Sequence, residues 1–177
     1  MLVVRLDEIN DLENLPDKEL YIFTGNTINS LITFPPNTRR LRLTYKIKDV
    51  VLPEGLTHLE LSENYIKKLV FPSTLISLEI SKSYHPELDN LPDNLETLVI
   101  IEGYNNSIVK YPPKLKKLSV GSNSNIQLDD LPSSLEFLLI GFYNKPINNF
   151  PIGLKGIVSN KRNNITNIPF GCKIIYS

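Results

Sequence analysis

The chain has 177 residues, of which 41% are hydrophobic, and this is enough for one domain with its own core. Nineteen basic and nineteen acidic residues cancel, so no overall field would draw the protein to nucleic acid or to an anionic membrane. The first ten residues lack the apolar run of a secretory signal, and no segment reaches transmembrane length. A single cysteine, Cys172, excludes an internal disulfide, and together these features predict a cytoplasmic protein.

The first predicted element is a short leading strand at Met1–Leu6, and a repeat follows it. An apolar residue followed by proline recurs nine times, with the prolines 18 to 20 residues apart. These repeat prolines are Pro16, Pro35, Pro53, Pro72, Pro92, Pro112, Pro132, Pro151 and Pro169. Self-similarity at a short fixed period is typical of a solenoid, in which each repeat stacks on its neighbours. We therefore predict a single domain over residues 1–177 with about nine repeats of 18–20 residues.

Each repeat is expected to contribute one short strand soon after its proline. The sixth residue after the proline is aliphatic in every repeat: Ile22, Leu41, Leu59, Leu78, Leu98, Leu118, Leu138, Ile157 and Ile175. Further apolar columns lie three and eight residues after the proline and four before it, and in repeats such as the one with Arg40 to Leu43 the +6 and +8 residues alternate with polar ones. This alternation indicates strands with one buried face, which predicts a parallel sheet of about ten strands. A proline at a fixed place would break a helix, so the opposite side should be extended or a short 3₁₀ turn.

The third repeat, Leu56–Leu69, reads LTHLELSENYIKKL and resembles the leucine-rich-repeat consensus LxxLxLxxNxxxxL. In that family the asparagine bonds backbone groups of adjacent turns. The asparagine is present at Asn64 and Asn123, but other repeats replace it with Ser83, Gly103 and Tyr143. The resemblance implies a β-rich solenoid with a parallel concave sheet and few or no α-helices, but without an unbroken asparagine ladder.

The segment Leu131–Pro151 is similar to an FNIP repeat, a leucine-rich-repeat relative abundant in social amoebae and in giant viruses that infect amoebae. Phe142, Asn144, Pro146 and Ile147 carry this similarity. The resemblance implies protein binding on a curved solenoid, inside the host cytoplasm if the protein is viral.

Catalysis is not expected from this sequence. No phosphate-binding, dinucleotide-binding or nucleophile-elbow motif occurs. His58 and His85 are far apart in the array, and neither has metal-ligand spacing with the other or with Cys172. Cys172 occupies an apolar position of the last repeat and is interpreted as a packing residue rather than a nucleophile. We predict that the protein is not an enzyme and uses no cofactor and no metal.

The residues five, seven and nine positions after each proline are expected to line the exposed face of the concave sheet. This face begins polar and charged and ends apolar. The candidate protein-binding residues are Arg40, Arg42, His58, Glu60, Glu79, Val99, Ile101, Phe137, Leu139 and Val158. The last five would form an apolar patch that the fold does not need. Such a patch favours an interface with a protein partner, for example a host protein. The alternative is that codon bias scattered these residues, or that the chain itself covers them.

A second class of function competes with this interpretation. Residues Ile174–Tyr176 form an apolar strand edge that is able to pair with another copy of the chain. The alternative prediction is therefore a self-assembling solenoid, a homodimer or oligomer joined through its C-terminal end.

Overall fold

The computed structural model describes residues 3–5, 20–24, 28–43, 47–61, 68–81, 84, 86–143, 145–147, 149–160 and 165–176. These residues contain twelve strands and no helix. The strands are β1 (Val3–Arg5), β2 (Leu20–Thr24), β3 (Ile28–Thr33), β4 (Arg40–Leu43), β5 (Ile47–Val51), β6 (His58–Leu61), β7 (Ser77–Ile80), β8 (Thr97–Ile100), β9 (Lys117–Val120), β10 (Phe137–Ile140), β11 (Gly156–Ser159) and β12 (Lys173–Tyr176).

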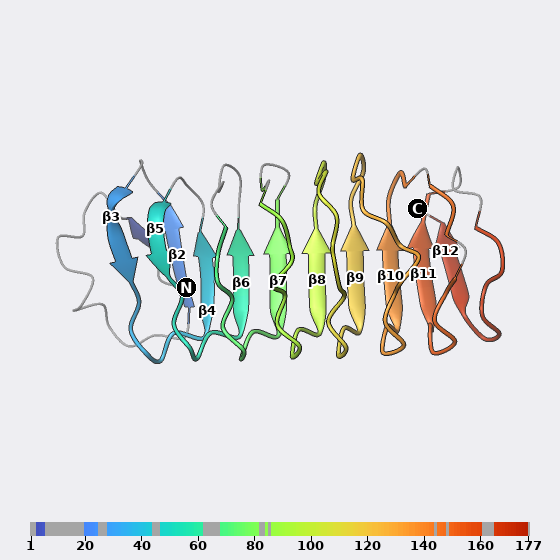
Figure 1. The fold of residues 1–177 in the computed structure, drawn as a ribbon, viewed down its shortest axis with the longest axis horizontal. Helices are drawn as coiled ribbons and strands as arrows, with labels where there is room; N and C mark the ends of the chain where they lie inside the picture. The colour runs from blue at the N-terminus through green and yellow to red at the C-terminus, as the bar shows by residue number, and fades with distance from the viewer. Residues whose placement is uncertain are drawn as a thin grey trace.

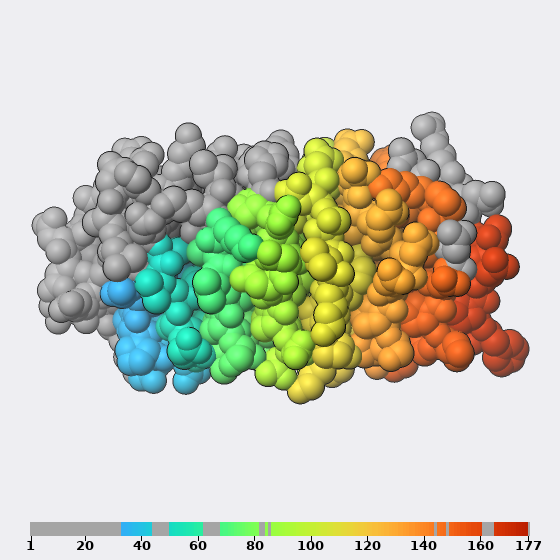
Figure 2. All heavy atoms as spheres, in the orientation of Figure 1, coloured from blue at the N-terminus to red at the C-terminus, as the bar shows by residue number. Residues whose placement is uncertain are grey.

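Ten strands form one sheet in the order β1-β2-β4-β6-β7-β8-β9-β10-β11-β12, and every neighbouring pair is parallel (Figure 1). Strands β3 and β5 form a separate parallel pair. The turns stack as adjacent bands along the long axis of the molecule (Figure 2). The predicted sheet of about ten strands and the predicted leading strand are confirmed. The pair of strands β3 and β5 agrees with the prediction of extended backbone outside the main sheet.

The repeat prolines from Pro35 to Pro169 each begin a β-turn that leads into the next strand. In eight repeats, from Pro35 to Pro169, the proline carbonyl accepts the amide of the third residue after it, at 3.0 to 3.1 Å. The next residue then bonds to the preceding turn: the Ile76 carbonyl accepts the amides of Glu96 and Thr97, at 2.8 and 3.0 Å. The same pattern recurs from turn to turn, and it holds the strands at a constant register.

The core is built from the apolar columns that the spacing predicts. In the repeat after Pro92, Leu95, Leu98 and Ile100 are all fully buried. The +6 column is buried from Leu41 to Ile157, and the opposite wall is closed by residues such as Leu69, Leu88, Leu128 and Ile147. Removal of so much apolar surface from water is the main force holding the turns together.

The register departs from the proline count at both ends of the array. In β2, Ile22 pairs in register with Arg42 instead of with Leu41. Ile175 pairs with Val158 and is 62% exposed, while Ile174 takes the place beside Ile157. Because side chains alternate between the faces of a strand, a shift of one residue moves the whole strand pattern to the other face.

The turn before β12 differs from the others in its backbone. Gly171, the third residue of the turn that begins at Pro169, has a φ of 80°, which is typical of a type II turn. The other proline turns have no positive φ at this place among the described residues. This different turn accompanies the shift that packs Ile174 against the core.

Buried tyrosines join the turns at or next to the position where the family consensus has asparagine: Tyr143 occupies that position, and Tyr104 directly follows Gly103, which occupies it. The Tyr104 hydroxyl is fully buried, accepts the Leu88 amide at 3.0 Å and donates to the Pro86 carbonyl at 2.9 Å. The Tyr143 hydroxyl donates to the Ile126 carbonyl at 2.9 Å. Asn123 is exposed with a φ of 59°, so it forms no buried rung, while Asn64 and Ser83 lie outside the described residues. The prediction of a broken asparagine ladder is confirmed at Asn123 and Tyr143.

Candidate protein-binding surface

The outward side of the ten-stranded sheet, here called the sheet face, brings together the residues predicted as a binding site. Two rows cross it in register. One row holds the +5 residues Arg40, His58, Ser77, Thr97, Lys117, Phe137 and Gly156. The other holds the +7 residues Arg42, Glu60, Glu79, Val99, Ser119, Leu139 and Val158. Ile101 directly follows β8.

The half of the sheet face over β4, β6 and β7 is charged. Arg42 and Glu60 form an ion pair with Nε and Oε1 2.5 Å apart, and this hydrogen bond raises the pKa of Arg42. Burial raises the pKa of Glu79, and the neighbouring Glu60 carboxylate adds to the effect. His58 Nδ1 lies 2.9 Å from the Thr57 hydroxyl. The ion pair is partly exposed, with 44% of the Arg42 side chain and 28% of the Glu60 side chain open to solvent.

The half over β8 to β12 carries the apolar residues of the predicted patch, but β9 divides them into two groups. Phe137 is 45% exposed and Ile101 is 46% exposed, while Val99, Leu139 and Val158 are half-buried. Between these two groups β9 presents Ser119, and Gly121 follows it. The predicted single patch is therefore two neighbouring patches.

Gly121 is required by the packing of the backbone. A Cβ atom at this position would lie 1.3 Å from the carbonyl oxygen of Ile101, a distance that no side chain tolerates. The Gly121 amide donates to the Ile100 carbonyl at 2.7 Å, and this hydrogen bond holds the backbones of the two neighbouring turns close together. The gap in the apolar surface thus follows from the fold.

The larger patch continues onto β12. The Phe137 ring lies over Gly156, since a Cβ there would be 3.2 Å from Cδ1 of the ring. The register shift of β12 places Ile175 beside Val158 and Lys173 beside Gly156. We call Phe137, Leu139, Val158 and Ile175 the apolar row. The sequence pattern missed Ile175 and Lys173 because the proline spacing assigns them to other columns.

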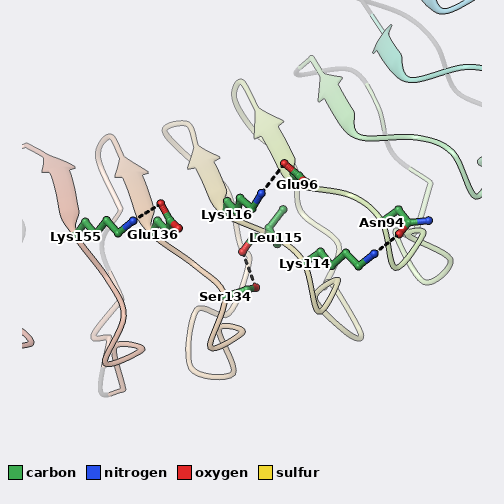
Figure 3. Close-up of polar contacts among 8 residues, drawn as sticks. All are labelled: Asn94, Glu96, Lys114, Leu115, Lys116, Ser134, Glu136 and Lys155. Atoms are coloured by element: carbon green, nitrogen blue, oxygen red, sulfur yellow. Dashed lines mark hydrogen bonds and ion pairs between the residues drawn. The ribbon is translucent and has the colours of Figure 1, made fainter.

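The edge of the sheet where the strands begin carries a ladder of polar pairs between successive turns (Figure 3). Lys116 Nζ lies 3.0 Å from a Glu96 carboxylate oxygen, and Lys155 Nζ lies 2.8 Å from Glu136. Lys114 donates to Asn94 at 2.7 Å along the same direction. These charges satisfy one another and stand beside the sheet face rather than on it.

Other chemistry has little support in the described part of the chain. Its His, Cys, Asp and Glu side chains form no group of three or more that could hold a metal ion. No helix in it is long and apolar enough to cross a membrane. Cys172 packs against the core, and burial raises the pKa of its thiol, which agrees with a packing role.

Comparison with solved structures shows the fold class. The chain is similar to the giant-virus protein CroV588, described as a novel circular LRR protein, with a TM-score of 0.74 and 23% identity. The likeness covers 92% of this chain but 27% of CroV588, so the chain spans about a quarter of that protein's length. The chain therefore has the fold of a leucine-rich-repeat solenoid.

Comparison with protein families finds one match. Residues 45–83 match the family described as FNIP Repeat. The match covers less than a quarter of the chain. It lies before Leu131–Pro151, the segment whose sequence resembles an FNIP repeat. A search of curated proteins finds no match.

Proposed function

We propose that the protein is an interaction module that binds a protein partner through the apolar row of the sheet face. The observation that carries this proposal is the exposure of Phe137 and Ile175, at 45% and 62%, on the same face as Leu139 and Val158 and on adjoining register rows. Contiguous apolar surface that does not support the fold is typical of protein interfaces. The partner is a protein of the cytoplasm in which the module acts, a host protein if the module is viral.

The test uses neutral substitutions on two faces of the molecule. Phe137→Ser with Leu139→Ser removes apolar surface from the sheet face, while Val70→Ser with Val109→Ser removes it elsewhere, where Val70 is 85% and Val109 73% exposed. Proteins retained from amoebal lysate are identified, purified and titrated against each variant. We expect the affinity to fall at least about tenfold for the sheet-face variant alone. Equal affinity of both variants would contradict the proposal.

Self-association through β12 is the second candidate function. Phe170 is fully exposed beside this strand, and Tyr176 is 48% exposed, so the described edge of the sheet is apolar. Strand edges with apolar side chains are templates for pairing with another chain. If β12 mediates self-association, light scattering should show an oligomer that grows with protein concentration. The double variant Phe170→Ser with Tyr176→Ser should then be a monomer. A wild-type monomer at all concentrations would exclude it.

A further inference from the structure

Lysines in the described part of the chain differ in their partners. Lys68, Lys116 and Lys155 each pair with a carboxylate on an adjacent turn, at 2.6 to 3.0 Å. Lys117 and Lys173 have no ion pair among the described residues, and both are exposed on the sheet face. Two lysines beside the apolar row are therefore without a carboxylate partner among the described residues.

These two lysines lie in one register row with Phe137 between them. Lys117 pairs with Phe137, Phe137 with Gly156, and Gly156 with Lys173. Three strand spacings of about 4.8 Å separate the lysines, or about 14 Å between their Cα atoms. The Phe137 ring covers Gly156, so an aromatic surface fills the interval between the two charges.

The charge of this half of the sheet face has one sign. The +5, +7 and +9 positions over β8 to β11 carry Lys117 but no carboxylate, and β12 adds Lys173. The carboxylates Glu60 and Glu79 lie on the other half, next to Arg42. A partner that covers the apolar row must therefore bring its own negative charge, because burial of an unpaired ammonium is costly.

We propose that the apolar row binds an acidic protein segment, with one apolar side chain on Phe137 and carboxylates on both sides reaching Lys117 and Lys173. This inference rests on the proposed function and names the chemistry of the partner. In an extended segment, residues i and i+4 are about 13 Å apart and point the same way, which matches the separation of the lysines. The expected pattern is acidic-x-apolar-x-acidic.

A single-stranded nucleic acid is a different class of partner that also combines negative charge with stacking bases. Such sites use a basic groove and several aromatic platforms along the strand. Here the row offers one aromatic ring, and its other members, Leu139, Val158 and Ile175, are aliphatic. The aliphatic surface favours a protein segment.

The experiment selects binding peptides from a random display library on the purified full chain and measures their affinities by fluorescence anisotropy. We expect selected peptides to share the acidic-apolar-acidic pattern and to bind about tenfold more weakly to Lys117→Gln and to Lys173→Gln. The matched controls are Lys116→Gln and Lys155→Gln, whose lysines pair with Glu96 and Glu136 off the face. They should leave the affinity unchanged, and higher salt should weaken wild-type binding.

Two different failures are separable. If selected peptides lose affinity for Phe137→Ser with Leu139→Ser but not for the Lys117 and Lys173 variants, the apolar row binds protein and the acidic partner is wrong. If the selection yields no peptide that depends on Phe137 and Leu139, the proposed function itself is overturned. Tighter binding of a single-stranded oligonucleotide, lost in Lys117→Gln, would replace the protein segment with a nucleic acid.

Discussion

The inward columns and the sheet face contain the same kinds of aliphatic residue, but these residues have different roles in the two places. On β8, Leu98 and Ile100 point inward and are fully buried, while Val99 between them is half-buried on the outside. The inward residues touch equivalent residues of the neighbouring turns, so each turn needs the next. In the described part of the chain, no further layer of the protein covers the outward residues. Apolar residues inside the solenoid therefore set its stability, and those outside are available for a partner.

The largest expected effect distinguishes these two sets directly. Leu118→Ala removes a fully buried side chain from the middle of the core and should lower the free energy of unfolding by about 3 kcal/mol. Leu139→Ala, on the half-buried outward side of β10, should lower it by less than about 1 kcal/mol. Urea unfolding followed by circular dichroism measures both. Equal losses would mean that the sheet face is part of the stabilising core.

A smaller effect is expected from the tyrosine that joins two turns. Tyr104→Phe keeps the ring but leaves the Leu88 amide and the Pro86 carbonyl without the hydroxyl, at a cost of about 1 to 3 kcal/mol. The control is Tyr176→Phe, because that ring is 48% exposed. An unchanged unfolding midpoint in Tyr104→Phe would show that the buried hydroxyl is not a structural link.

The same tyrosine predicts a dependence of stability on alkaline pH. Burial raises the pKa of Tyr104 from 10.0 to about 12, because the anion would lose its hydration. The folded chain then holds a proton that the unfolded chain releases above pH 10, so this contribution is complete below pH 10 and is lost as the pH rises through about 12. Tyrosinate absorbance of the folded protein should show a late-ionising group that Tyr104→Phe removes. Titration of every tyrosine near 10 would contradict this.

The smallest effect is expected at the charged ladder beside the sheet. Lys116 and Glu96 have side chains that are 52% and 39% exposed, so solvent screens their attraction. Lys116→Gln should change the free energy of unfolding by less than about 0.5 kcal/mol. A loss comparable to that in Tyr104→Phe, measured by the same urea unfolding, would show that the ladder is a main stabilising element.

Much of the fold could be predicted because it depends on a repeated spacing. The proline carbonyl accepts the +3 amide in eight repeats, so residues at equal distances from the proline reach equal positions. This is why the columns through Leu95, Leu98 and Ile100 were identified from sequence, together with the outward set of candidate binding residues. That residues 1–177 form one domain stays a prediction.

The parts of the fold and of the candidate site that were not predicted depend on local backbone geometry, which the proline spacing does not reveal. The one-residue shift at β12 accompanies the positive φ of Gly171, and it moves Ile175 and Lys173 onto the sheet face. The close approach of Ile101 to Gly121 divides the apolar surface, although both residues fit the outward pattern. The tyrosine links were missed because Tyr104 lies in a stretch whose length varies between repeats.

The most direct test of the central claim is site-specific photo-crosslinking in cells. A photo-reactive phenylalanine analogue replaces Phe137 on the sheet face in one sample and Val109, which is 73% exposed off that face, in another. The account predicts a covalent adduct with a protein from position 137 and none from position 109. An adduct from position 109 alone, or none from position 137, would contradict it.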